Sequence, residues 1–134
     1  MTIDILNPRQ FILGGKAEFT LKNTNTDISY QYRVNKKGNL YFIKVRTNSH
    51  KYWHYAGFLN ENYAFIKGNK GEYRYDSPQI KGILYALKHT NKLNKPMVMY
   101  HHGKCACCGK KITDEESVRL GIGPTCRKYY LREV

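Results

Sequence analysis

The chain has 134 residues and carries 23 Lys and Arg against 10 Asp and Glu, a formal net charge of +13. Its 41 % hydrophobic residues suffice for one folded domain with a small appendage, and no apolar run has the length of a membrane helix. The composition therefore excludes a membrane span and favours a polyanionic partner, namely DNA, RNA or an acidic protein.

The first half of the chain predicts an antiparallel β-meander. Residues 1–17 form an irregular lead-in, because Pro8 and the pair Gly14–Gly15 interrupt any regular element. From residue 18 onward, apolar and polar side chains alternate along short runs that are separated by turn residues, which is typical of half-buried strands. We expect five or six strands up to residue 75, the last two being a short pair at 63–66 and 72–75.

One helix is expected outside the cysteine-rich region, over about residues 77–93. Ser77 is a good N-cap and Pro78 suits the first turn. Apolar residues at helical spacing, which should pack on the sheet, are Ile80, Ile83, Leu84 and Leu87. A short strand from residue 97 then leads to the finger, without a flexible linker. The predicted fold is thus α+β, with residues 1–96 forming a meander with one packed helix. Residues 97–134 contain four cysteines, Cys105, Cys107, Cys108 and Cys126, whose spacing predicts a small treble-clef-like zinc finger.

All four cysteines lie in the last third of the chain. Cys105 and Cys108 have the spacing of a zinc knuckle, and Gly109 lets the backbone turn. Pro124 begins a predicted helix, so Cys126 lies in its first turn, where amides and the positive helix end favour a thiolate. No secretory signal is visible, so we expect a reducing, cytoplasmic location and a bound Zn²⁺ in place of disulfides.

A closed zinc site needs a fourth ligand. Cys107 is poorly placed, because adjacent side chains cannot both point inward from one turn. His101 is preferred, His102 is second, and a carboxylate from the run Asp114–Glu116 is third. The expected metal ligands are therefore Cys105, Cys108, Cys126 and His101.

The motifs of this region resemble a known family. They comprise the pattern His-x3-Cys-x2-Cys-Gly, the segments Ile112–Asp114 and Glu116–Val118, and the run Gly121-Ile122-Gly123-Pro124-x-Cys126. Over about residues 100–128 they are similar to a treble-clef-like zinc-binding domain of unknown function that is common in tailed-phage proteins. The upstream part more loosely resembles the region preceding this finger in small phage proteins. The resemblance implies a zinc finger in a phage-type protein that acts on nucleic acid. Cys107 departs from the family, which more often has a basic or small residue there.

Catalysis is not expected. Treble clefs with nuclease activity need a later histidine, and none follows residue 102. The sequence has no glycine-rich phosphate loop and no paired carboxylates. We therefore expect no enzymatic activity and no small-molecule substrate.

The expected function is non-catalytic binding of single-stranded or structured DNA or RNA. Basic residues interleave with aromatic residues along the predicted strands and surround the finger, as in a stacking platform beside an electrostatic groove. The residues expected to contact nucleic acid are Lys36, Lys37, Lys44, Arg46, Lys51, Trp53, Tyr55, Lys104, Lys110, Lys111, Arg127 and Lys128. The alternative is a small phage inhibitor that binds a host protein or defence complex in the host cytoplasm.

Overall fold

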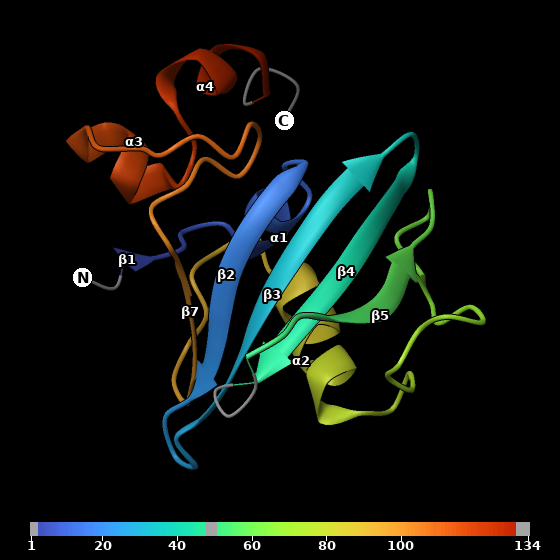
Figure 1. The fold of residues 1–134 in the computed structure, drawn as a ribbon. Helices are drawn as coiled ribbons and strands as arrows, with labels where there is room; N and C mark the ends of the chain where they lie inside the picture. Colours follow the sequence, from blue (N-terminus) through green and yellow to red (C-terminus); the bar gives the residue numbers. More distant parts are fainter. Residues whose placement is uncertain (1–2, 48–50, 131–134) are drawn as a thin grey trace.

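The structure is a computed structural model that describes residues 3–47 and 51–130, so the last four residues of the predicted finger lie outside the described part. Its centre is a seven-stranded sheet of order β1-β7-β2-β3-β4-β5-β6, in which all neighbouring strands are antiparallel (Figure 1). The predicted α+β class is confirmed.

Five consecutive strands form the predicted meander. They are β2 (Lys16–Asn23), β3 (Ile28–Lys37), β4 (Leu40–Thr47), β5 (His54–Leu59) and β6 (Phe65–Ile66). Burial alternates along β4 and most of β3, as expected for a sheet with one covered face. The predicted strand at 72–75 is absent: this segment is irregular, and its Glu72 N–H donates to the Tyr55 carbonyl at 2.9 Å.

Two regular elements lie within residues 1–17, which were expected to be irregular. Strand β1 (Ile3–Asp4) pairs with the edge of β7, and helix α1 (Pro8–Ile12) follows it. Asn7 caps α1, because its side chain accepts the Gln10 N–H at 3.1 Å. Both elements are too short to produce a periodic pattern.

Helix α2 (Pro78–Leu87) covers one face of the sheet, as predicted, although it ends before residue 93. The Ser77 side chain caps it by accepting the Ile80 N–H. The fully buried residues that the sheet contributes to the core include Phe19, Tyr32, Val34, Ile43 and Val45. The Tyr32 hydroxyl donates to the Gln79 carbonyl at 2.7 Å, so the buried ring also satisfies its polar atom.

Strand β7 (Met97–His101) returns from α2 to the free edge of β2, pairing His101 with Phe19 and Met99 with Leu21. The chain then enters the cysteine-rich region, which carries α3 (Glu115–Leu120) and α4 (Pro124–Tyr130) and lies at one end of the sheet (Figure 1). Both α1 and α2 lie behind the sheet in Figure 1, so the face toward the viewer is not covered by a helix. None of the helices in the described residues is long and apolar enough to cross a membrane.

Phe11 connects the core to the cysteine-rich region. Its ring meets the edge of Phe19 at 6.1 Å between centroids and stacks on His101 at 5.9 Å. Gly121 ends α3 with φ +73°, and a Cβ there would approach the Phe11 ring to 2.6 Å. The two regions thus pack without space for one further carbon atom.

We expect Phe11→Ala to lower the free energy of unfolding by about 3–5 kcal/mol, because it leaves a cavity between the sheet and the cysteine-rich region. Urea unfolding followed by circular dichroism measures this change. Tyr75→Ala is the control, since Tyr75 is 70 % exposed and its loss should change stability by about 0.5 kcal/mol or less. Equal effects of the two substitutions would contradict the role of Phe11 in joining the core to the cysteine-rich region.

Candidate metal centre and the adjoining sheet face

The knuckle forms as a tight turn. The Cys105 N–H donates to the Lys110 carbonyl at 2.8 Å, and the Gly109 N–H donates back to the Cys105 carbonyl at 2.9 Å. Gly109 has φ +77°, a conformation that glycine adopts without strain. Lys104 and Lys111 close the turn through an antiparallel bridge.

The two short helices present the fourth cysteine to this turn. Asp114 caps α3, because its carboxylate accepts the Ser117 N–H at 3.0 Å. Gly121 then ends the helix in the left-handed conformation, and Pro124 begins α4. Cys126 is the third residue of α4, so the predicted placement in a first helical turn is found.

Three cysteines come together in the structure. The Sγ atoms of Cys105, Cys107 and Cys126 all lie within 4.8 Å of one another, a group that could hold a metal ion. Cys108 lines the same hollow of about 270 Å³ as Cys105 and Cys126. The expectation that Cys107 is poorly placed as a ligand therefore differs from the structure, where its Sγ lies within 4.8 Å of those of Cys105 and Cys126.

The structure does not bring His101 into this group. Its Nε2–H donates to the Val118 carbonyl at 2.6 Å, and its Nδ1 accepts the Gly103 N–H at 2.9 Å. Both ring nitrogens are thus used, and burial lowers the pKa of the imidazole, so His101 is a neutral packing residue. His102 instead faces Glu18, with Nδ1 3.1 Å from Oε2, and Asp114 is used as a helix cap.

The charges of the cysteine group favour a bound cation. Cys105 is fully buried, and its pKa falls to about 4 because the Cys107 thiol and the amides of Gly123, Cys108 and Cys107 stabilise its thiolate. The same thiolate keeps its neighbours protonated. The pKa of Cys107 is raised because its thiol donates to Cys105 and is buried. The pKa of Cys126 is raised to about 11, first by burial and then by the adjacent sulfurs of Cys105 and Cys108. Sulfurs this close cannot all ionise unless a cation offsets their charge, and a coordinating metal deprotonates thiols outright. The donor set therefore fits a thiophilic metal.

We expect metal content to depend on all four cysteines and not on a histidine nitrogen. The sulfur-to-metal charge-transfer band of the Co²⁺-loaded protein reports how many thiolates bind, and the intensity of four is expected. Cys105→Ser should lose the metal, whereas Cys107→Ser should weaken the band by about one quarter or abolish it. If the band instead has the intensity of three thiolates and Cys107→Ser leaves it unchanged, the ligands are Cys105, Cys108, Cys126 and a histidine.

The uncovered face of the sheet adjoins this centre. A row of cross-strand neighbours runs from Glu18 on β2 through Arg33 and Lys44 to Tyr55 on β5. Glu18 binds Arg33, with 2.6 Å between Oε1 and Nε, and its Oε2 lies 3.6 Å from Lys104 Nζ. This carboxylate joins the sheet to the cysteine-rich region. The hydrogen bond from His102, followed by the contacts with Arg33 and Lys104, lowers its pKa to about 2 against the opposing effect of burial.

Trp53 lies on the same face, against two guanidinium groups. The Arg33 Cζ is 4.2 Å and the Arg46 Cζ is 4.7 Å from the ring centroid. Each contact is a cation–π interaction worth about 0.5–1 kcal/mol at a partly exposed site. Arg46 also donates from Nε to the Gln31 side chain at 2.9 Å. Trp53 therefore holds the guanidinium groups of Arg33 and Arg46 on the uncovered face of the sheet.

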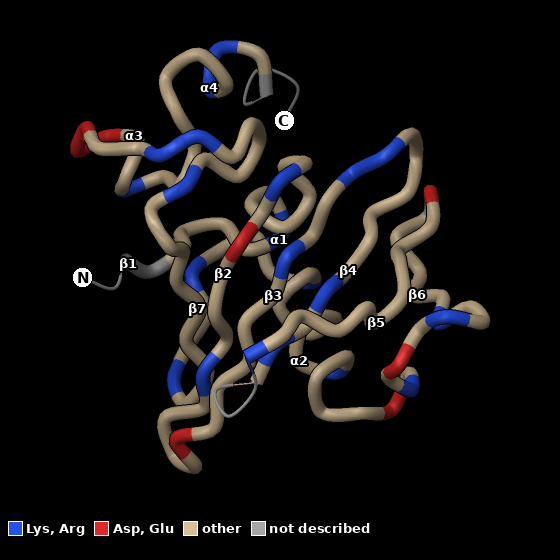
Figure 2. Tube along the Cα trace, in the orientation of Figure 1, with Lys and Arg blue, Asp and Glu red and all other residues tan. Residues whose placement is uncertain are grey.

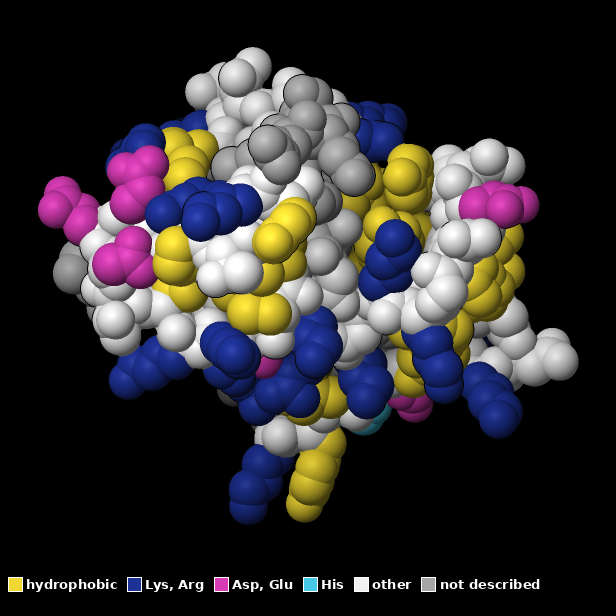
Figure 3. All heavy atoms as spheres, turned by 90° about the horizontal axis from the view of Figure 1, so that it is seen from above, with side chains coloured by type: hydrophobic (Ala, Val, Ile, Leu, Met, Phe, Trp, Pro, Cys, Tyr) yellow, Lys and Arg dark blue, Asp and Glu magenta, His cyan; other side chains and the backbone are white. Residues whose placement is uncertain are grey.

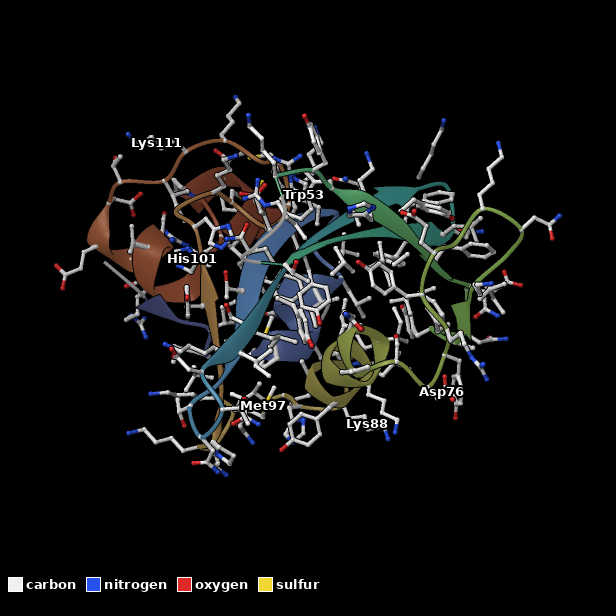
Figure 4. All side chains as sticks on the ribbon, turned by 60° about the horizontal axis from the view of Figure 1, so that its bottom comes forward. Trp53, Asp76, Lys88, Met97, His101 and Lys111 are labelled. Atoms are coloured by element: carbon white, nitrogen blue, oxygen red, sulfur yellow. The ribbon has the colours of Figure 1, made fainter. Side chains whose placement is uncertain are left out.

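The predicted nucleic-acid residues divide between several surfaces. Lys44, Arg46 and Tyr55 occupy the uncovered face, and Trp53 and Lys111 lie on one side of the sheet in Figure 4 whereas Lys88 lies on the other. Lys36 has the opposite strand parity, with its Nζ 5.7 Å from the Tyr41 ring. The remaining predicted residues lie at the end of β3, before β5 or in the finger: Lys37, Lys51, Lys104, Lys110, Arg127 and Lys128.

Three cations that face this surface or its margin were not among the residues predicted from the sequence: Arg33, Lys67 and Lys70. Arg33 alternates with the buried residues Tyr32 and Val34, so period-two alternation was a signal for its outward direction. Lys67 and Lys70 lie in a turn, and their position depends on how that turn folds back over β5.

We expect Glu18→Gln to destabilise the protein at neutral pH by up to about 3 kcal/mol, from a pKa shift of 4.5 to about 2. Because the folded-state pKa is depressed, the stabilisation is present above the unfolded pKa and declines as pH falls from about 4.5 toward 2. The difference between wild type and Glu18→Gln in urea unfolding at pH 7 and pH 3.5 measures it. Glu61→Gln, at an exposed position, is the control. A difference that stays constant with pH would refute the ion-pair role.

Comparison with known proteins gives a match to the finger region of the chain. Residues 96–131 match a family of unknown function, DUF6011. The matched segment comprises β7, the cysteine turn, α3 and α4, and leaves the meander and α2 outside. No match was found among curated proteins or among solved structures.

Proposed function

We propose that the cysteine group binds one structural Zn²⁺ through Cys105, Cys107, Cys108 and Cys126. Four thiolates leave no open coordination position, which is the pattern of closed structural zinc sites and not of catalytic ones. The ion would supply the positive charge that lets all four thiols ionise. Elemental analysis of the purified protein tests its identity, and one zinc per chain is expected.

We further propose that the uncovered face of the sheet binds nucleic acid without catalysing a reaction. The observation that supports this is the gathering of Lys and Arg on that face, which forms the lower edge of Figure 3. Acidic residues lie mainly at the margins of the fold (Figure 2). Glu18 is the exception, and its carboxylate is already engaged by Arg33, His102 and Lys104. The finger adds Lys104 and Lys111 at one end, so the cations can follow a phosphate backbone.

The resemblance to a phage-type finger supports the same function class. It suggests an accessory protein of a phage, acting in the host cytoplasm on single-stranded or structured DNA or RNA. The DUF6011 match covers only the finger region and brings no assigned activity.

We expect the logarithm of the binding constant to fall with the logarithm of salt concentration with a slope of about −3.5 to −4.5, for about five neutralised phosphates. Fluorescence anisotropy with labelled oligonucleotides measures the slope. Lys44→Gln should make it shallower by about one, whereas Lys88→Gln on the helix side should not change it. Equal effects of the two variants would point to a diffuse basic surface without a binding face.

A second candidate function is inhibition of a host protein. An apolar groove of about 410 Å³ between the β2–β3 hairpin and α2 favours it, since Ile28 is 53 % and Tyr85 is 43 % exposed there. Pull-down from host lysate with and without nuclease distinguishes the candidates. Capture of a single host protein that survives nuclease treatment, together with no oligonucleotide binding, would favour the inhibitor.

A further inference from the structure

A second hollow lies on the uncovered face, away from the cysteines. It has a volume of about 420 Å³ and is lined by Phe42, Tyr55 and Phe58 and by the turn 67–70. The size falls within the range of about 300–1,000 Å³ that small-ligand sites occupy. The three aromatic side chains are partly exposed, so they do not close into a core of their own.

The floor of the hollow is a fixed aromatic surface. The ring centroids of Phe42 and Phe58 are 5.8 Å apart, and those of Phe42 and Tyr55 are 6.4 Å apart. Phe42 and Phe58 are direct cross-strand partners, and Tyr55 pairs with Lys44. Two paired strands therefore hold the rings, and little ordering is needed when a flat ligand binds.

The wall of the hollow is fixed as well. A Cβ on Gly71 would lie 2.2 Å from the Lys67 carbonyl oxygen and 2.7 Å from that of Ala56, so the turn is packed tightly against β5. The Glu72 N–H bond to Tyr55 anchors its far end. The exposed side chains of Lys67 and Lys70 stand on this wall, and Lys44 lies beside Tyr55.

The chemistry of the site selects the occupant. The lining provides aromatic surface and two ammonium groups, and it contains no carboxylate. A flat aromatic ring attached to an anionic backbone complements it, and an unpaired nucleobase with its phosphate has that composition. Trp53 is less suited to stacking, because Arg33 and Arg46 already lie against its ring.

We propose that this hollow is a subsite for one unpaired base, so that the basic face prefers single-stranded over double-stranded nucleic acid. The inference rests on the nucleic-acid function proposed above. The cations from Lys104 to Lys44 bind the backbone, and Lys67 and Lys70 bind the phosphate next to the inserted base. A paired base cannot enter, because its ring faces are covered by its neighbours in the duplex.

The experiment uses the full chain and oligonucleotides containing one 2-aminopurine, whose fluorescence changes when the base changes its stacking. On binding the single strand, wild type and Phe58→Tyr should change the 2-aminopurine signal and bind more tightly than to the matching duplex. Phe58→Leu should remove the signal change and weaken single-strand binding by about 5- to 150-fold, the range for one lost base stack. Tyr85→Leu on the helix side is the matched control and should behave like wild type.

The outcomes separate the two proposals. No binding of either oligonucleotide at low salt would overturn both. Binding with the expected salt slope, but with Phe58→Leu equal to wild type or with the duplex preferred, would overturn the base subsite and leave the basic face intact. Metal content and thermal unfolding check that each variant is folded. If Phe58→Leu fails this check, Tyr55→Leu replaces it, and unchanged single-strand affinity and fluorescence there would equally refute the subsite.

Discussion

The pairing of β7 with β2 is the constraint on which the arrangement of the molecule depends. It places His101 opposite Phe19 and brings the start of the cysteine-rich region to the open face beside Glu18. Had β7 added to the other edge of the sheet, next to β6, the finger would be separated from Glu18 by the whole meander. The ion pairs of Glu18 with Arg33 and Lys104, and the continuity of the basic surface, follow from this one pairing.

Local signals predicted the parts of the fold that depend on near neighbours. The α2 cap at Ser77 and the alternation along β3 and β4 are properties of short segments, and both were predicted from the sequence. The position of β7 was not predicted, because its strand order depends on contacts between residues about 80 positions apart. The elements β1 and α1 were missed for a related reason: they owe their structure to β7 and α2, with α1 lying against α2.

In the candidate metal centre, too, short-range features were predicted from the sequence and long-range contacts were not. Spacing predicted that Cys105, Cys108 and Cys126 would approach one another, and the structure places Cys105 and Cys126 together, with Cys108 lining the same hollow. The exclusion of Cys107 differs from the structure, where its Sγ lies within 4.8 Å of those of Cys105 and Cys126. The role of His101 could not be predicted in this way, since its ring nitrogens are used by Gly103 and Val118 in the folded chain. Proximity in sequence made it a good candidate ligand, and the packing of Phe11 on its ring made it a core residue instead.

Local compensation of the charge repulsion explains how the open face can remain folded in the absence of a partner. Arg33 and Arg46 lie against one indole ring, and Glu18 neutralises part of the charge at the finger end. Each contact is weak by itself, worth about 1 kcal/mol or less when exposed, and salt screens the ion pairs. Toward the hollow at Phe58, Lys67 and Lys70 stand on a wall that has no carboxylate in its lining. The electrostatic compensation is therefore strongest beside the finger and weakest beside the aromatic floor. An anionic ligand would consequently bind most favourably at the hollow, where its charge offsets that of lysines without a carboxylate beside them in the lining.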